Sequence, residues 1–353
     1  MSSTLSFATA TTALPDWPRA TDLPPAGRYR QCPADFIVTE QLGFEPEGHG
    51  EHLWLWVEKR ELNTMQVVDR LARLFDVQRR NIGFSGLKDK TAITRQWISL
   101  PMPDGGIPDA ATVAPLEAQG IRVLSMRRHP RKLKRGTHRF NHFSLVIGFD
   151  EAHRDDIMYR WTRIVSEGVP NYFGSQRFGF QGRNIEHALQ LFAKGWRKRD
   201  DKQGIFLSAA RSLLFNQLLA QRVALGNWNR ALPGEVFNLD GTASQFYEDT
   251  VDATLHARLA RLDIHPTGPM WGKGPLESQH DVATLEQAVA DNMPRVVDGL
   301  ITAGLTSSRR ALRLRLREPS FVVTMQGATL EFSLVKGAFA TSVLRELIDA
   351  PGL

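Results

Sequence analysis

The sequence is poor in the features that mark secreted, membrane-spanning and metal-cluster proteins. Cys32 is the only cysteine among 353 residues, so the chain can form no internal disulfide and no thiolate metal cluster. No run approaches the roughly 18 consecutive apolar residues of a membrane span. Residues 1–16 lack the basic start and apolar core of a secretory signal. We therefore expect a protein of the reducing cytoplasm with no membrane partner.

Signatures of cofactor binding are scarce as well. The sequence has no Rossmann glycine pattern and no clustered cysteine and histidine ligands. Lys90-Thr91 mimics the end of a P-loop, but Asp89 stands where that motif requires glycine. We predict neither a metal nor a nucleotide cofactor, and nothing in the sequence demands more than a monomer.

The chain does have a globular composition with a basic balance. Its apolar content of 42% and charged content of 23% are typical of soluble domains. Its length suffices for two domains with ordinary cores. The net charge of +6 favours a polyanionic partner such as a nucleic acid.

The stretch Asn81–Thr91 combines an apolar segment with an isolated carboxylate. Ile82–Leu87 predicts a short buried strand that leads into Asp89. Lys88 and Lys90 flank this carboxylate, and their positive charges favour its ionised form. Such a group can act as a nucleophile or base toward an anionic polymer, or it can simply occupy a solvated turn.

Two arginine-rich segments offer positive charge. Six of the nine residues in Arg127–Arg135 are Lys or Arg. In Arg309–Arg317 a period of two predicts a strand with leucines on one face and arginines on the other. Both segments can contact RNA phosphates or remain solvated. From the first segment we predict these RNA-binding residues: Arg127, Arg128, Arg131, Lys132, Lys134 and Arg135.

Four segments resemble the TruD family of transfer-RNA pseudouridine synthases. Phe84–Gln96 resembles the family signature, whose Lys-Asp-Lys/Arg run holds the catalytic Asp. Asp35–Glu40, Gly168–Gly179 and Gly337–Leu347 resemble three further family segments in the same order. The resemblance extends from about residue 30 to residue 348.

The resemblance implies a discontinuous fold. It implies an α/β (α+β) architecture whose synthase core, residues 30–167 and 319–353, contains a mixed, largely antiparallel sheet. A second α/β domain, residues 168–318, is inserted into that core. Residues 1–29 lie outside the core and are rich in Ser, Thr, Ala and Pro, so we expect them to be extended or partly disordered.

The resemblance also implies a site and a reaction. Asp89 would be the catalytic carboxylate and Arg30 its cationic partner, at a position where the family more often has Lys. Asn141 would help hold the site, and Phe143 would stack on the target base. Three further cations are expected to bind RNA: Lys88, Lys90 and Arg177. The implied reaction is cofactor-free isomerisation of a flipped-out uridine to pseudouridine, at position 13 of the tRNA D-stem.

The residues leave two other classes of function to weigh. A catalytically silent RNA-binding or assembly protein would share the basic segments, but it would not need Asp89 among them. A metal-dependent RNA hydrolase would need clustered carboxylates or histidines, which the sequence lacks. We therefore favour the synthase and keep the silent RNA-binding protein as the alternative.

Neutralising Arg131, Lys132 and Lys134 together is expected to flatten the salt dependence of RNA affinity. A cation that binds a phosphate displaces counterions from the RNA, so removing one such cation should lower the slope of log Kd against log salt by about 1. Transcript binding over a salt series measures this slope. An unchanged slope would remove the segment from the RNA interface.

Overall fold

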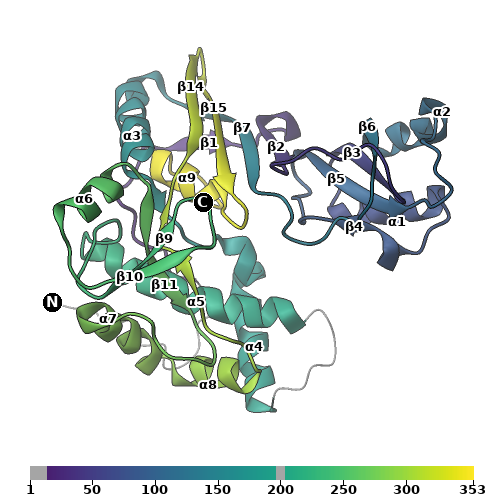
Figure 1. The fold of residues 1–353 in the computed structure, drawn as a ribbon. Coiled ribbons are helices and arrows are strands. Elements are labelled where there is room, and N and C mark those ends of the chain that lie inside the picture. Colours follow the sequence, from purple (N-terminus) through teal and green to yellow (C-terminus); the bar gives the residue numbers. More distant parts are fainter. Residues whose placement is uncertain (1–13, 196–202) are drawn as a thin grey trace.

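The computed structural model describes residues 14–195 and 203–353. Figure 1 shows α3 and α9 at the β14–β15 end of a large sheet, an outlying part on the right that carries α1, and a helix-rich part below. No helix within the described ranges is long and apolar enough to cross a membrane.

The large sheet is mixed and largely antiparallel, as the family resemblance implies. Its order is β14-β15-β7-β2-β5-β3-β6, with β1 also paired to β7 and β4 to β5; only β2 and β5 are parallel. Its strands are β1 (Gly27–Tyr29), β2 (Phe36–Gln41), β3 (His52–Arg60), β4 (Gly83–Phe84), β5 (Ile93–Pro101), β6 (Ile121–His129), β7 (Phe140–Phe149), β14 (Arg317–Thr324) and β15 (Gly327–Val335).

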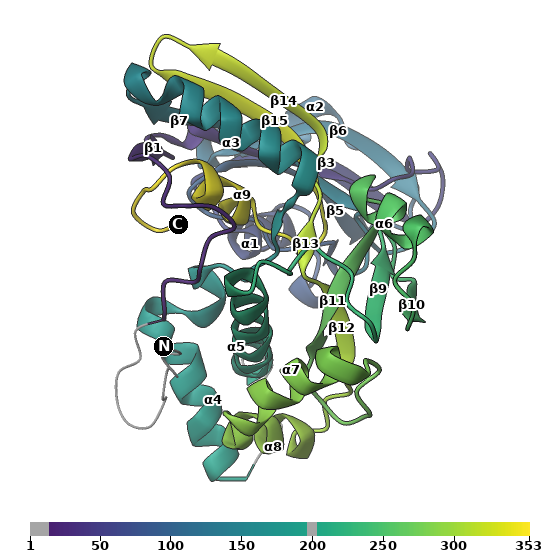
Figure 2. The ribbon, with the colours of Figure 1, turned by 90° about the vertical axis from the view of Figure 1, so that its left-hand side faces the viewer.

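A smaller sheet and several helices make up most of the remaining structure. Figure 2 shows α5 beside β11, with α7 and α8 close to it. The smaller sheet has the order β10-β9-β11-β12, from β9 (Glu235–Leu239), β10 (Gln245–Glu248), β11 (Ile264–Met270) and β12 (Ser308–Ala311); β8 (Val169–Pro170) pairs separately with β13 (Arg313–Leu314). The α-helices are α1 (Thr64–Leu74), α2 (Ala110–Val113), α3 (Arg154–Glu167), α4 (Arg183–Ala193), α5 (Gln203–Ala224), α6 (Ala253–Ala260), α7 (His280–Asp291), α8 (Pro294–Thr302) and α9 (Ala340–Leu347).

One face of the large sheet carries the core and also some polar groups. Residues paired across strands share a face, and a row of such pairs runs from Lys59 through Thr94, Val38 and Phe143 to Phe332. Helices α3 and α9 cover the apolar end of this face, and α1 covers the face of β3 and β5. The polar residues lie between the two apolar clusters.

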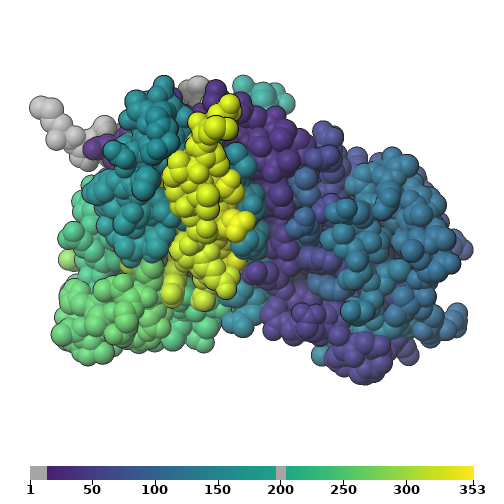
Figure 3. Space-filling view, turned by 90° about the horizontal axis from the view of Figure 1, so that it is seen from above, coloured from purple at the N-terminus to yellow at the C-terminus, as the bar shows by residue number. Residues whose placement is uncertain are grey.

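Both chain ends contribute to this sheet. Strand β15 pairs with β7 along its whole length, and β7 pairs with β2. Figure 3 shows the C-terminal strands between α3 and the N-terminal half of the chain. A core built from both ends agrees with the implied discontinuous domain, while its boundaries at residues 168 and 319 stay a prediction.

The segment 14–29 has little regular secondary structure but packs against the rest of the chain. It contains β1, and Trp17 stacks on Tyr172 with 6.0 Å between ring centroids. Residues 1–13 lie outside the described residues. The motif loop Gly168–Gly179 is a packed joint, because Tyr172 and Phe173 are buried and Asn216 of α5 bonds the backbone of Phe173 at both N and O.

One local prediction is wrong. Only Gly83–Phe84 of the predicted strand Ile82–Leu87 pairs, since the following residues are held by side chains instead of a ladder. Near the C-terminus, Phe339 is the N-cap residue of α9, and the Ser342 hydroxyl donates to the Tyr172 carbonyl at 3.0 Å.

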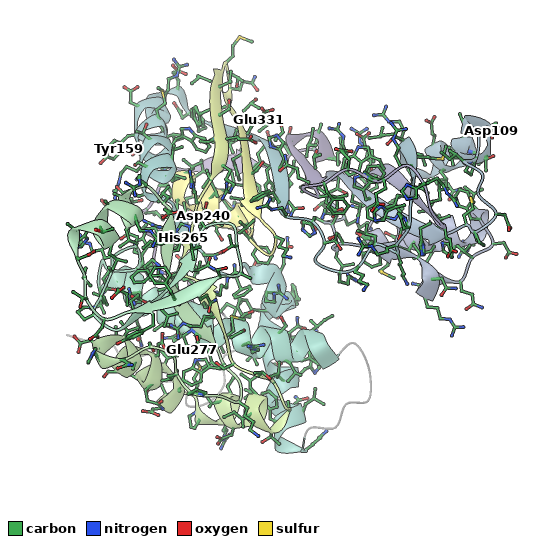
Figure 4. All side chains as sticks on the ribbon, viewed as in Figure 1. Asp109, Tyr159, Asp240, His265, Glu277 and Glu331 are labelled. Atoms are coloured by element: carbon green, nitrogen blue, oxygen red, sulfur yellow. The ribbon has the colours of Figure 1, made fainter. Side chains whose placement is uncertain are left out.

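The predicted arginine stripe is not free for RNA. Arg313 is buried and donates to His265 Nδ1 at 3.0 Å. Arg315 and Arg317 both pair with Asp240, which lies beside His265 in Figure 4. These three arginines therefore have partners within the protein, although the alternation of the sequence predicted that they would face solvent.

Phe143→Ala is expected to destabilise the fold. The ring is buried against Phe332, with 5.6 Å between centroids, and against Phe36, with 6.2 Å. Removing a buried phenyl ring leaves a cavity and costs about 3–5 kcal/mol. Denaturant unfolding measures the loss; a change below about 1 kcal/mol would show that the ring packs little.

Candidate active site

Asp89 receives hydrogen bonds from three directions. Arg30 Nη2 lies 3.0 Å from Asp89 Oδ2, and Gln176 Nε2 lies 3.3 Å from the same oxygen. The Lys90 amide donates to Oδ1 at 3.1 Å. The Asp89 side chain is 31% exposed, so it is both held and accessible. The structure thus brings Asp89 and Arg30 together as the resemblance implies.

Arg30 is fixed by an unusual local geometry. Its φ of 52° lies in the left-handed region, which non-glycine residues rarely adopt. The guanidinium carbon lies 3.7 Å from the centroid of the Phe36 ring, a cation–π contact. The side chain is only 16% exposed. Arg30 therefore meets Asp89 as a largely immobilised cation.

A second cation, Lys59, lies beneath the loop that carries Asp89. Lys59 is buried, and its Nζ donates to the Asp89 backbone carbonyl at 2.5 Å. Burial lowers the pKa of Lys59 to about 8, against the opposing effect of the Asp89 charge; Lys88 lowers it further. The sequence prediction did not name this lysine as a site residue.

The loop Gly86–Asp89 is anchored by side chains from the sheet and from α1. Gln96 Nε2 donates to the Gly86 carbonyl at 3.1 Å. The Lys88 amide donates to Thr64 Oγ1 at 2.9 Å, and the Thr64 hydroxyl donates to Gln96 Oε1 at 2.9 Å. Buried side chains thus provide the hydrogen bonds that a strand ladder would otherwise supply.

Lys88 is not an RNA-binding residue, contrary to the sequence prediction. Its Nζ lies 2.8 Å from Glu40 Oε2, and both side chains are buried. Burial raises the pKa of Glu40, and the Lys88 charge partly offsets this rise. Exposure alternates along the loop, with Leu87 65% and Lys88 8% exposed. Lys88 therefore points inward, while the next residue, Asp89, points toward Arg30.

His138 completes the buried polar cluster. Its Nδ1 lies 2.5 Å from Ser85 Oγ and 3.8 Å from Glu40 Oε2. Burial, helped by the charges of Lys88 and Lys336, lowers the pKa of His138 to about 4. The imidazole is thus neutral at physiological pH. Asn141 Nδ2 lies 3.4 Å from His138 Nε2, so Asn141 joins this cluster behind the loop.

Phe143 does not present a face to a base in this structure. The ring belongs to the sheet core and is 5% exposed. Phe36 lies between it and Arg30, since Phe36 contacts both. Stacking on a flipped base would require the ring to be uncovered. The geometry therefore favours a core role for Phe143.

The predicted basic segment divides into exposed and buried members. Arg128 is wrong as an RNA contact, because it is buried and donates to the carbonyls of Gly50, Met102 and Gly106. Lys132 is half-buried and donates to the Arg80 carbonyl. The members that remain exposed are Arg127, Arg131, Lys134 and Arg135, together with Lys90 of the catalytic loop.

Arg177 lies close to the site without touching Asp89. Its neighbour Gln176 makes that contact, whereas Arg177 Nη1 donates to Ser208 Oγ at 2.9 Å. Both belong to the short 3-10 helix Ser175–Phe178, which follows the packed joint. The sequence prediction named the arginine and missed the glutamine, since a side-chain amide carries no charge signal.

Removing one partner of the Lys88–Glu40 pair is expected to cost more stability than removing both. Glu40→Gln or Lys88→Met leaves a buried charge unpaired, at a cost of about 3–5 kcal/mol, whereas the double variant leaves none. Denaturant unfolding of the three variants measures this. A double variant that loses the sum of the single losses would show that the two charges are not coupled.

The comparisons with known proteins identify the family of the chain. The sequence model described as tRNA pseudouridine synthase D (TruD) matches residues 19–198 and 199–347. A curated tRNA pseudouridine synthase D of Chromohalobacter salexigens is 49% identical over 96% of this chain and 98% of its own length. That of Methylococcus capsulatus is 42% identical over 96% and 97%.

A solved structure supports the fold independently. The crystal structure of a protein assigned as tRNA pseudouridine synthase D (TruD) from Methanosarcina mazei superposes with a TM-score of 0.70. It covers 96% of this chain and 97% of its own, at 22% identity. The chain belongs to the TruD family of tRNA pseudouridine synthases, isomerases that convert uridine in tRNA to pseudouridine.

Proposed function

We propose that Asp89 is the catalytic carboxylate of this isomerase. The observation that carries the proposal is the convergence of Arg30, Lys59 and Gln176 on a single accessible Asp. These residues lie 59, 30 and 87 positions from Asp89 in sequence. Perturbed or tightly held ionisable groups of this kind are typical of catalytic sites.

The reaction exchanges one glycosidic bond for another. The bond from ribose C1′ to uracil N1 breaks, the bond from C1′ to C5 forms, the C5 proton leaves and N1 gains a proton. No electrons are gained or lost overall. Asp89 serves this rearrangement either as a nucleophile toward the ribose or uracil ring or as a base toward a ribose proton. Arg30 keeps the carboxylate oriented in either case.

The proposed substrate is a uridine in the D-stem of tRNA, at position 13. A uridine stacked in a stem must be flipped out before Asp89 can reach it, which costs a few kcal/mol. Phosphate contacts of exposed cations such as Lys90 and Arg131 offset this cost. We further propose that the enzyme acts in the cytoplasm as a monomer, with residues 168–318 as an inserted domain.

Asp89→Asn is expected to abolish turnover while leaving folding and tRNA binding nearly unchanged. The amide is nearly isosteric with the carboxylate but is neither a nucleophile nor a base. Tritium release from tRNA transcripts labelled at uridine C5 measures turnover, with an expected loss of at least about 10³-fold.

The matched control is Asp104→Asn, which changes an exposed carboxylate in the linker after β5. It should release tritium at the wild-type rate. Release by Asp89→Asn at that rate would remove Asp89 from the chemistry. Release by neither wild type nor variant, with RNA still bound, would instead favour the silent RNA-binding protein.

A further inference from the structure

Two arginines from distant segments contact one buried aromatic ring. The guanidinium carbon of Arg310, in β12, lies 4.1 Å from the centroid of the Phe173 ring. That of Arg177, in the 3-10 helix, lies 5.3 Å from the same centroid. Arg310 also lies 5.5 Å from the Phe215 centroid, and Arg177 lies 5.8 Å from that of Phe339. Packed aromatic rings therefore fix both guanidinium groups.

Neither guanidinium has a carboxylate partner among the described residues. Within residues 14–195 and 203–353, no Asp or Glu oxygen lies within 4.0 Å of Arg177 or Arg310. Arg310 donates to Asn171 Oδ1 at 2.6 Å and to the Gly337 carbonyl at 3.1 Å. Its buried Nε finds no partner in the same part of the chain. Neutral acceptors thus orient the two cations without balancing their charge.

Two other buried arginines have carboxylate partners, whereas Arg128 and Arg313 are held by neutral acceptors. Arg309, the residue before Arg310, pairs with Glu286 through buried side chains. Arg222 pairs with Glu235 at 2.9 Å, also fully buried. A buried charge without a counter-ion is costly. Arg310 therefore lacks the carboxylate partner that its neighbour Arg309 has, and it lies close to a second unpaired cation, Arg177.

The two cations also oppose each other. Burial lowers the pKa of Arg310 to about 9, and the charge of Arg177 lowers it further. Burial lowers the pKa of Arg177 as well. Like charges held together in this way favour binding of an anion, which relieves the repulsion. Arginine suits a phosphate group because its fork presents parallel donors.

One arginine of the pair is adjacent in sequence to a residue that contacts the proposed catalytic carboxylate. Gln176 contacts Asp89, and Arg177 is the next residue along the chain. Gly337, whose carbonyl accepts from Arg310, directly follows Lys336, another cation. The arginines also retain access to solvent, since both are only partly buried. Arg177 therefore belongs to the same short 3-10 helix that contacts Asp89.

We propose that Arg177 and Arg310 together bind one backbone phosphate of the RNA, close to the uridine presented to Asp89. The inference rests on the proposed function in placing that uridine, but the arginine site itself is defined by binding. It adds Arg310, which lies in the arginine-rich segment Arg309–Arg317 but was not among the predicted RNA-binding residues, to the substrate-binding residues. The proposal also adds to the RNA interface the region where β12, the 3-10 helix Ser175–Phe178 and the end of β15 meet.

The test is the salt dependence of transcript binding by Arg177→Gln, Arg310→Gln and the double variant. Each single variant should lower the slope of log Kd against log salt by about 1, the value for one phosphate contact. Because the arginines share one phosphate, the double variant should lower the slope by the same amount and not by twice as much. Its loss of affinity should be smaller than the product of the single losses.

Arg295→Gln is the matched control, since this exposed arginine on α8 has no place in the proposed site. It should bind with the wild-type slope. An unchanged slope in the double variant would overturn the proposal, and a double loss would show two separate phosphates and overturn the shared site. If Arg310→Gln fails to fold, the slope of the Arg177→Gln variant alone decides whether a phosphate is bound there.

Asp89→Asn is measured in parallel to separate the two hypotheses. It should bind with the wild-type slope, because it removes no phosphate contact. If it still released tritium, the proposed catalytic role would fail, while the slopes of the arginine variants would remain a valid test of the phosphate site.

Discussion

The geometry around Asp89 depends on the burial of the neighbouring Lys88. Taking an ammonium group out of water costs several kcal/mol unless an opposite charge meets it, and Glu40 meets it at 2.8 Å. Glu40 belongs to β2 and Lys88 to the loop, so their ion pair ties the loop to the middle of the sheet. With Lys88 turned inward, Asp89 is left at the surface, where Arg30 and Gln176 reach it.

The same carboxylate links parts of the chain that are distant in sequence. Arg30 comes from the segment before β2, and Gln176 comes from the 3-10 helix beyond the packed joint at Tyr172. The joint is itself fixed by Ser342 of α9, whose hydroxyl bonds the Tyr172 carbonyl. The site is therefore complete only when both chain ends and the intervening part have folded together. Asp89 therefore acquires its hydrogen-bond partners only after these distant segments of the chain have packed together.

Much of the fold could be predicted because strand alternation and helix periodicity are local signals. The alternation in β3 also places Lys59 on the buried face of the strand, because it lies two residues after Val57 in the series Leu53, Leu55 and Val57, which all face the core. Other features could not be predicted. Lys88 and Lys90 are the same residue type on either side of Asp89, and only tertiary packing makes one buried and the other exposed. Gln176 is uncharged and lies outside any periodic pattern, so the sequence offers no signal for its contact with Asp89.

The arginines show why net charge is a poor guide to a binding surface. Arg309 and Arg310 are adjacent on β12, yet one meets Glu286 and the other meets aromatic rings and neutral acceptors. Only cations left without a carboxylate can supply uncompensated charge to RNA. Such contacts hold the backbone and read no base. Phosphate contacts of the proposed kind would therefore hold and position the RNA, and the choice of the base must depend on other contacts.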